Sequence, residues 1–376
     1  MQENFTLKQI PSKVWNEFIL FPWSSQIYKN DPYWVPSLIS EDKKLFNPSI
    51  HPFHKYAEIT LFLLYQNKKP VGRIAAIINH SHNKFHNEKV GFFGFFESIN
   101  SPKAAQYLID TVSKHLKAKG MEVIRGPMNF STNDTCGLLI EGFDSSPLFM
   151  MTYNPPYYTE LLESAGLHKA KDLYAYYADR SIAEQLPRLE RLSQKVLSDK
   201  SVRIRCLDMK NIVRDIGIIK EVYNNAWSKN WGFVPMTEEE FDYLANDMRK
   251  IVDPDFVLIA EIDGTPAGFS MALPDYNQII KKCNGRLFPF GIFHFLFGKS
   301  KIKTMRILTM GVVHQYQKRG LDIVFYLETI KRGFKKGYQK AELSWILEDN
   351  IMMNRILNSL GAKVYKKYRI FEKSIS

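Results

Sequence analysis

The stretch Arg306-Ile-Leu-Thr-Met-Gly-Val-Val-His-Gln-Tyr-Gln-Lys-Arg-Gly-Leu-Asp322 decides the fold of the C-terminal half of the chain. Its apolar beginning predicts a strand, its basic middle predicts a short loop, and a helix is predicted from Asp322 to Lys336. A loop that opens into a helix presents free backbone N–H groups and the positive end of the helix dipole to an anion. Lys318 and Arg319 add positive charge, and Gly320 lets the backbone approach a ligand closely. The stretch therefore predicts a site for a phosphate-bearing ligand.

The composition indicates a globular protein of two or three domains. The chain has 376 residues, of which 45% are hydrophobic and 14% aromatic. Cys136, Cys206 and Cys283 are far apart in sequence, which favours a reducing compartment over a disulfide framework. The first residues have no basic start followed by an apolar run, so we expect no signal peptide. No apolar run approaches the ~20 residues of a spanning helix. We therefore expect a cytoplasmic protein.

The net charge of +12 predicts an anionic partner. Nucleic acid is not expected, because no nucleic-acid-binding motif accompanies the charge. An anionic membrane surface is a further candidate partner. A polyanionic cofactor would account for only a few of the charges.

Alternation, helical spacing and turn residues predict the elements of the C-terminal half. The predicted strands are 202–207, 256–261, 267–273, 306–313, 341–347 and 363–371. The predicted helices are 212–227, 238–251, 322–336 and one that Asn350 opens and Gly361 ends. Asp263-Gly264 is a strong hairpin signal between two of the strands.

The N-terminal half repeats this plan weakly. Strands are predicted at 58–65, 71–79, 90–97 and 169–177, and a helix from Pro102 to Lys119. The separation of Gly120 and Gly166 is 46 positions, against 24 for Gly337 and Gly361, so the first copy holds an insertion of 22 residues. The insertion falls around residues 126–136, whose Ser, Thr, Asn and Gly content predicts a loop. We interpret the two halves as a duplication.

The C-terminal half resembles a GNAT acyltransferase, a member of the Gcn5-related N-acetyltransferase superfamily. Gln317-Lys-Arg-Gly320-Leu-Asp322 matches the family's phosphate loop, Gln/Arg-x-x-Gly-x-Gly/Ala, except that Asp322 replaces a small residue and would repel a pyrophosphate. The resemblance implies acyl-CoA as co-substrate. It places in cofactor binding the residues Gly311, Val312, Val313, Gln315, Gln317, Lys318, Arg319, Gly320, Leu321 and Asn350. The family often has a tyrosine seven or eight residues after the asparagine, but Leu357 and Asn358 stand there.

The N-terminal half also resembles a GNAT domain, but its loop, Ser98-Ile-Asn-Ser-Pro102, lacks the glycine and the basic residues. We therefore expect an α+β protein of two tandem GNAT-like domains, each a mixed, mostly antiparallel sheet flanked by helices. The predicted domains are 1–180, without cofactor, and 201–376, with the acyl-CoA site, joined by a helix at 181–200. The layout, including Glu342-Leu-Ser-Trp345, resembles a bacterial tandem GNAT group with relatives linked to ceramide synthesis.

The chemistry that the resemblance implies requires a phosphate anchor, an N–H donor for the thioester oxygen and a base for the amine. Glu342 is the first candidate base, because Glu342 and Ser344 on one face of a central strand suggest that this face lines a cleft. The alternative is a face that meets water or an arginine partner. Glu348 and His314 are weaker candidate bases, and Tyr365 or Tyr368 could protonate the leaving thiolate. His51, His54, His80 and His82 suggest no metal site, because no third ligand is evident.

One segment bears on the substrate class. Residues 287–298 are almost wholly apolar and are bordered by Lys281, Lys282 and Arg286 before them and Lys299, Lys301 and Lys303 after them. The segment is too short to span a bilayer. It suits either an element that dips into a membrane interface, or the mouth of a lipid tunnel, or a buried element between domains.

The main hypothesis is a peripherally membrane-associated N-acyltransferase that moves an acyl group from acyl-CoA to a primary amine, such as a long-chain sphingoid base. A second hypothesis is a Fem-like transferase that uses aminoacyl-tRNA, although no basic helical arm is visible. A third is a non-catalytic acyl-CoA-binding protein, which the Asp322 departure and the missing tyrosine favour.

Overall fold

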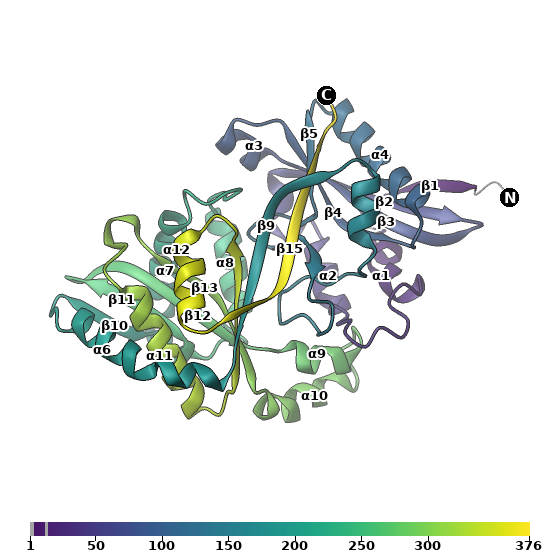
Figure 1. The fold of residues 1–376 in the computed structure, drawn as a ribbon. Helices are drawn as coiled ribbons and strands as arrows, with labels where there is room; N and C mark the ends of the chain where they lie inside the picture. Colours follow the sequence, from purple (N-terminus) through teal and green to yellow (C-terminus); the bar gives the residue numbers. More distant parts are fainter. Residues whose placement is uncertain (1–3, 12–13) are drawn as a thin grey trace. The chain divides into compact units, whose positions relative to one another are not determined.

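The computed structural model describes residues 4–11 and 14–376 (Figure 1). Residues 1–3, part of the stretch on which the signal-peptide prediction rests, lie outside this range. The chain forms two compact units. Unit 1 holds the residues up to Leu173 together with 277–299 and 366–376, and unit 2 holds 174–276 and 300–365. The predicted domains are continuous segments, whereas unit 1 also takes up two later segments of the chain.

Unit 1 is built on a mixed sheet with the strand order β1-β2-β3-β4-β5-β15. Neighbouring strands are antiparallel except β4 and β5, which pair in parallel from Val90–Val123 to Phe92–Arg125. The strands are β1 Phe5–Ile10, β2 Ala57–Gln66, β3 Lys69–Asn79, β4 Val90–Ser98, β5 Val123–Gly126, β6 Met128–Asn129, β7 Thr135–Cys136 and β8 Leu138–Glu141. β9 His168–Ala178 and β15 Lys363–Ser374 contribute residues to both units.

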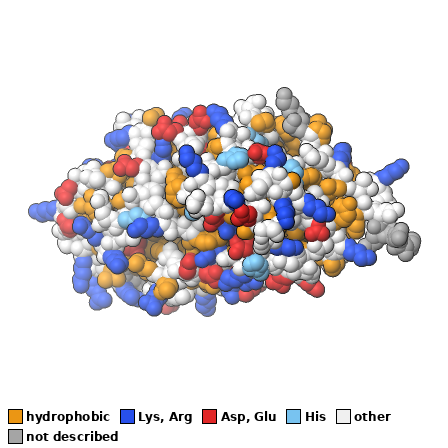
Figure 2. Space-filling view, turned by 90° about the horizontal axis from the view of Figure 1, so that it is seen from above, with side chains coloured by type: hydrophobic (Ala, Val, Ile, Leu, Met, Phe, Trp, Pro, Cys, Tyr) orange, Lys and Arg blue, Asp and Glu red, His pale blue; other side chains and the backbone are white. Residues whose placement is uncertain are grey.

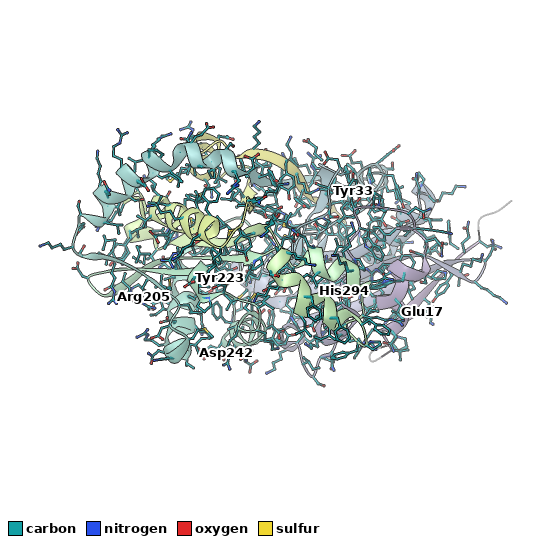
Figure 3. The ribbon with its side chains drawn as sticks, turned by 90° about the horizontal axis from the view of Figure 1, so that it is seen from below. Glu17, Tyr33, Arg205, Tyr223, Asp242 and His294 are labelled. Carbon is teal, nitrogen blue, oxygen red and sulfur yellow. The ribbon has the colours of Figure 1, made fainter. Side chains whose placement is uncertain are left out.

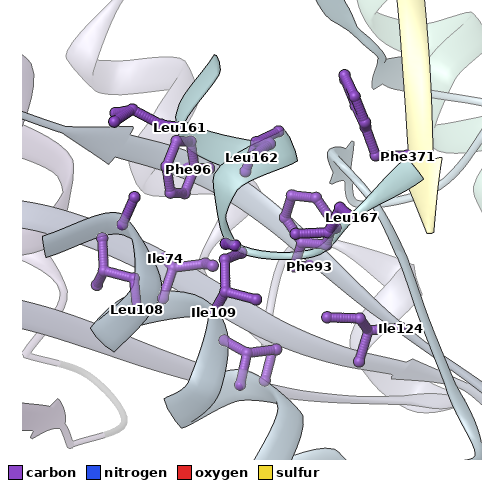
Figure 4. Packing of buried hydrophobic residues seen from close by; sticks show 14 of the residues in the cluster. Ile74, Phe93, Phe96, Leu108, Ile109, Ile124, Leu161, Leu162, Leu167 and Phe371 are labelled. Carbon is purple, nitrogen blue, oxygen red and sulfur yellow. The ribbon is translucent and has the colours of Figure 1, made fainter. Parts of the chain in front are cut away.

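The core of unit 1 lies between this sheet and two helices (Figure 4). α4 Pro102–Ala118 begins where Ser101 Oγ accepts a hydrogen bond from the Ala104 N–H, and Pro102 occupies its first turn. Leu108 and Ile109 of α4 are fully buried against the strands. The remaining helices are α1 Asn16–Ser24, α2 Ile39–Leu45, α3 His80–His86, α5 Tyr158–Ser164, α9 Asn277–Cys283 and α10 Gly291–Gly298.

The inserted segment of unit 1 is more ordered than the predicted loop. β6 and β7 form a small hairpin in which Met128 pairs with Cys136 and Asn129 with Thr135. A short strand, β5, precedes this hairpin, and β8 follows it. Two-residue strands leave no periodic pattern in the sequence, so composition alone favoured a loop.

In unit 2, the strands of the sheet follow the order β14-β13-β12-β11-β10. Neighbours are antiparallel except β13 and β14. The strands are β10 Val202–Cys206, β11 Val257–Ile262, β12 Thr265–Pro274, β13 Thr304–Val312 and β14 Lys340–Leu347. The helices are α6 Leu186–Leu197, α7 Ile212–Ala226, α8 Glu238–Met248, α11 Leu321–Lys335 and α12 Ile351–Ser359.

Helices cover both faces of the unit 2 sheet. On one face, α11 packs against Ile307 of β13 and Leu343 of β14. On the other face, α7 packs against Phe269 of β12 and Val313. The predicted α+β class is thereby confirmed, because each unit is a mostly antiparallel mixed sheet flanked by helices.

Two surface properties complete the description. Within residues 4–11 and 14–376, no helix combines the length and the apolarity that crossing a bilayer requires. On the face shown in Figure 2, Lys and Arg side chains lie among acidic and apolar ones and not in a single band. The positive charge on that face is therefore distributed.

Candidate active site

The site lies where β13 and β14 separate. These strands pair in parallel from Thr304–Lys340 to Ile307–Leu343, and both then continue for several residues. The β12–β13 register shifts between Met271 and Ala272, which marks an irregularity at the same level of β13. In the described residues, no β13–β14 backbone pair follows Ile307–Leu343, so the edge of β13 beyond Ile307 is not paired with β14.

Backbone alternation identifies which N–H groups point into this opening. The Val313 N–H bonds to the Ala267 carbonyl oxygen of β12 at 2.9 Å. Successive N–H groups of a strand point to opposite sides, so the Val312 N–H points away from β12. The Val312 carbonyl points the same way, since it accepts a hydrogen bond from Gln317 Nε2 at 3.3 Å. Among Gly311, Val312 and Val313, Val312 is therefore the residue that can donate to a ligand in the opening.

The predicted phosphate loop is an open turn at the start of α11. Gln315, Gln317, Lys318 and Arg319 are exposed, and Gly320 is the N-cap residue. Lys318 and Gly320 have positive φ angles of 64° and 81°. Backbone in alternating right- and left-handed conformations turns consecutive N–H groups toward one point, a geometry that binds anions. In the described part of the chain, no acceptor is assigned to the N–H groups of Lys318, Arg319 and Gly320.

His314 fixes this turn to the end of α7. Its N–H bonds to Asn225 Oδ1 at 3.1 Å, and its Nε2 lies 3.1 Å from Ser228 Oγ. Gln317 Nε2 lies 3.2 Å from His314 Nδ1, so both ring nitrogens have partners. This arrangement favours a structural role for His314 over the catalytic role that the sequence suggested.

Two other residues predicted to bind the cofactor have structural roles. Leu321, the first residue of α11, is buried in the core beneath the turn. Asn350 is the N-cap of α12, and its side chain accepts a hydrogen bond from the Met353 N–H at 3.2 Å. Asp322 is half-buried, and desolvation raises the pKa of its carboxyl above the usual value.

Glu342 is the centre of a buried polar network. Its side chain is fully buried, and it is the parallel-strand partner of Arg306. Arg306 Nε lies 3.5 Å from Glu342 Oε1 and donates to Ser344 Oγ at 3.1 Å. The Ser344 hydroxyl donates to Glu342 Oε1 at 2.5 Å. The arginine partner that the sequence left open as an alternative is therefore present, and Glu342 has no direct path to solvent.

Tyr365 is the half-buried member of this network. Its hydroxyl donates to Glu342 Oε2, and its ring lies 5.5 Å from the ring of Tyr177. Tyr365 is half-buried, whereas Glu342 is fully buried. Among these groups, the Tyr365 hydroxyl is the neighbour of the Glu342 carboxylate that belongs to a half-buried residue. Sequence reasoning placed Ser344 on the same strand face as Glu342 but did not select Arg306, although an Arg within an apolar strand was a usable signal.

Gly311 accommodates a tryptophan of α7's C-terminal end. A Cβ atom at Gly311 would lie 2.1 Å from Trp227 Cζ3. The Trp227 ring also stacks on Tyr223, with a centroid distance of 4.7 Å. Gly311 is therefore required for packing beside the opening, independent of any ligand.

Gly311→Ala should lower the free energy of unfolding by about 1–3 kcal/mol, because the added methyl group overpacks against the Trp227 ring. Gly217→Ala is the matched control, since no atom lies within 4 Å of a Cβ at Gly217 in the interior of α7. There the same change should stabilise by about 0.5–1 kcal/mol. Urea denaturation measures both values, and equal effects at the two glycines would contradict the packing role.

The corresponding region of unit 1 is filled by its own chain. The Phe95 N–H of β4 bonds to Asn129 Oδ1 at 2.7 Å. A Cβ atom at Gly94 would lie 1.9 Å from the Met128 carbonyl oxygen, so β6 runs directly beside β4. The Ser98 N–H is bound by the Tyr158 hydroxyl at 2.9 Å. These contacts leave little room for a ligand at the equivalent level of unit 1.

The candidate histidines have other partners. His54 Nε2 lies 2.9 Å from the Leu45 carbonyl oxygen, and His82 Nε2 lies 3.3 Å from Glu88 Oε2. No group of three or more His, Cys, Asp or Glu side chains with metal-binding geometry occurs in residues 4–11 and 14–376.

Comparison with known proteins places the chain in a family. No protein-family model matches it. Protein YghO of Escherichia coli (strain K12) is 35% identical over 364 residues, which cover 95% of this chain and 92% of that protein. The bacterial ceramide synthase of Caulobacter vibrioides (strain NA1000 / CB15N) is 34% identical over 382 residues, which cover 99% of this chain and 98% of that enzyme.

Two solved structures share the fold over nearly the whole chain. The tandem GNAT protein from the clavulanic acid biosynthesis pathway has a TM-score of 0.57 at 10% identity, covering 99% of both chains. The GCN5-related N-acetyltransferase from Sphaerobacter thermophilus has a TM-score of 0.55 at 11% identity, covering 99% of this chain and 96% of its own. The chain therefore belongs to the family of tandem GNAT-fold acyltransferases that includes the bacterial ceramide synthase of Caulobacter vibrioides.

Proposed function

We propose that the protein transfers an acyl group from acyl-CoA to the primary amine of a long-chain sphingoid base. The open turn of Lys318, Arg319 and Gly320 at the start of α11 carries this proposal, because its free N–H groups lie at the end of the strand that borders the opening. The same unit thus offers an anion site and an opening for a thioester. A long-chain acceptor resides in a lipid bilayer, so we place the reaction at a membrane surface.

The turn would hold the pyrophosphate of acyl-CoA. Its N–H groups and the positive end of the α11 dipole are attractive to an anion, and Lys318 and Arg319 add full charges. From the turn, the pantetheine arm would run into the opening between β13 and β14. There the Val312 N–H would donate to the thioester carbonyl oxygen and stabilise the oxyanion by a few kcal/mol.

Tyr365 and Glu342 would move the proton. The neutral amine attacks the carbonyl carbon and forms the C–N bond, and its proton passes to the Tyr365 oxygen as the tyrosine proton passes to Glu342. When the intermediate collapses, the C–S bond breaks and the proton returns along the same path to the sulfur. The products are an N-acyl amine and CoA thiol. In this scheme Tyr365 would touch the substrate, Glu342 would accept the tyrosine proton, and Arg306 would hold the Glu342 carboxylate in position.

The likeness to a named ceramide synthase supports a sphingoid base as the acceptor. The test is to incubate the purified protein with acyl-CoAs and a panel of amines that includes sphingoid bases, and to record free thiol and product mass. We expect thiol release that depends on a long-chain base and equals the amide formed. Acyl-CoA binding without turnover for any amine would instead indicate a non-catalytic binding protein, and turnover only with aminoacyl-tRNA a Fem-like transferase.

Lys318→Ala/Arg319→Ala should raise the KM for acyl-CoA by about tenfold, because two charge contacts of about 0.5–1 kcal/mol each are lost from an exposed site. The effect should shrink as salt rises. The KM for the amine should stay unchanged. Lys363→Ala, an exposed lysine of unit 2 outside the turn, is the matched control. An unchanged KM for acyl-CoA at low salt would contradict the assignment of the turn.

A further inference from the structure

We propose that α10 and the turn before it form a membrane-docking surface whose partner is an anionic lipid bilayer. The surface, here called the aromatic patch, consists of Phe288, Phe290, Phe293, Leu296 and Phe297. The inference deepens the proposed function, since it names the element that would bring the enzyme to its lipid substrate. Docking itself requires no acyl transfer, and the two can be tested separately.

The aromatic patch is exposed although its side chains are large and apolar. The exposed fractions are 75% for Phe288, 76% for Phe290, 52% for Phe293, 66% for Leu296 and 70% for Phe297. Phe290, Phe293 and Phe297 have the spacing of one helix face. In Figure 3, α10 is marked by the label of His294. Contiguous apolar side chains of this kind mark an interaction site on a soluble surface.

α9, the helix that precedes the aromatic patch, is packed firmly in unit 1. Its residues Ile279 and Ile280 are almost fully buried. Asn277 Nδ2 donates to the Pro147 carbonyl oxygen at 2.8 Å. After α9, Asn284 Oδ1 accepts a hydrogen bond from Trp23 Nε1 at 3.2 Å. All of these contacts lie within unit 1, so α9 and Asn284, which precede the aromatic patch in the chain, are held in place.

The charges around the patch select an anionic bilayer. Lys282, Arg286 and Lys299 are exposed beside it. The sequence contains no Asp or Glu between Asp275 and Asp322, so this part of the chain is uniformly basic. Basic side chains that border an apolar surface are attracted to acidic phospholipid headgroups, while the apolar side chains enter the region beneath them. A neutral protein groove would give these cations no counter-charge.

The dimensions of the segment suit insertion along the interface. α10 has 8 residues, whereas a helix that spans a bilayer needs ~20. Phe and Leu on one face with Lys and Arg at the borders are typical of helices that lie in the headgroup region. We therefore infer shallow insertion of the aromatic patch without crossing.

Vesicle co-sedimentation of the full chain tests the inference without acyl-CoA or amine. The wild-type protein should bind phosphatidylcholine vesicles that contain phosphatidylglycerol, and added salt should weaken binding. Phe290→Ser/Phe297→Ser should reduce the partition coefficient at least about tenfold, because two large apolar groups no longer enter the interface. Phe85→Ser, at a phenylalanine of α3 that is 47% exposed in the same unit, should leave binding unchanged.

A second variant, Lys282→Glu/Arg286→Glu, tests the contribution of the basic side chains. It should abolish the preference for phosphatidylglycerol-containing vesicles over pure phosphatidylcholine vesicles. Equal binding by wild type and Phe290→Ser/Phe297→Ser would overturn the inference. So would a wild-type dimer in lipid-free buffer that the same double variant converts to a monomer, since the patch would then be an interface between copies. Failure of the wild-type protein to bind vesicles would overturn the docking inference, whereas acyl transfer to a sphingoid base dissolved in detergent micelles tests the proposed acyl transfer without any vesicle, so the two outcomes can be distinguished.

A fluorescence readout covers the case in which the double variant folds poorly. Phe290→Trp keeps a large aromatic group at the most exposed position of the patch. Its emission should shift to the blue with phosphatidylglycerol vesicles and be quenched by lipids brominated near the headgroup. An unchanged spectrum in the presence of bound vesicles would show that another surface docks.

Discussion

Tyr365→Phe is expected to lower kcat by about 100-fold to 10,000-fold, the range for removal of a general acid–base group. The Tyr365 hydroxyl is the only atom of its side chain that can exchange a proton, and it donates to the fully buried Glu342. The KM for acyl-CoA should change little, because the turn of Lys318, Arg319 and Gly320 that we propose to bind the pyrophosphate belongs to a different element. Steady-state kinetics with acyl-CoA and a sphingoid base measure both parameters.

Tyr177→Phe is the matched control for this variant. Tyr177 is also a half-buried tyrosine and its ring contacts the Tyr365 ring, but the proposed proton path does not include it. Its loss of a hydroxyl should leave kcat within about a factor of three, a change of less than 1 kcal/mol. If Tyr365→Phe retained the wild-type kcat, the proton path through Glu342 would be wrong.

Arg306→Leu is expected to lower the free energy of unfolding by about 3–5 kcal/mol, because it leaves the Glu342 carboxylate buried without its cation. The Arg306 and Glu342 side chains are 3% and 0% exposed, so water cannot replace the lost charge. The Ser344 and Tyr365 hydroxyls still donate to Glu342, but they carry no charge. Urea denaturation followed by circular dichroism measures the loss.

The double variant Arg306→Leu/Glu342→Leu separates charge from packing. Replacing both partners with apolar side chains removes the unpaired charge and should recover most of the lost stability. Lys44→Ala is an exposed control, since the Lys44–Glu41 pair, at 2.9 Å, is 37% and 47% exposed and should contribute under about 1 kcal/mol. A double variant as unstable as Arg306→Leu alone would show that Arg306 acts through packing.

The sequence predicted the turn before α11 because its signals are local. A basic loop, a glycine and the start of a helix are adjacent in the chain, and the structure has an open turn in the same place. The strands and helices that were predicted lie within a few residues of the observed ones for the same reason, whereas β1, β5 to β8, α1 to α3, α9 and α10 were not predicted. The β11–β12 hairpin, for example, follows directly from Asp263-Gly264.

Longer-range features were not predictable in this way. The pairing of Glu342 with Arg306 depends on the register of two parallel strands separated by α11, and one sequence does not fix that register. The return of residues 277–299 to unit 1 depends on contacts such as that of Asn277 with Pro147, which are distant in sequence. The exposure of the aromatic patch was also undetermined, because apolar residues alone predict burial as readily as an interface.

Unit 1 is assembled from early and late segments of the chain, so its sheet can be completed only late in synthesis. Its sheet is completed by β15, where Phe371 pairs with Gly126 and Arg369 Nε bonds to Asp172 Oδ1 at 2.8 Å. A ribosome synthesises those residues only after the whole of unit 2. The N-terminal half must therefore wait, with an unpaired strand edge, until nearly the entire chain has emerged, and chaperones have that interval in which to act.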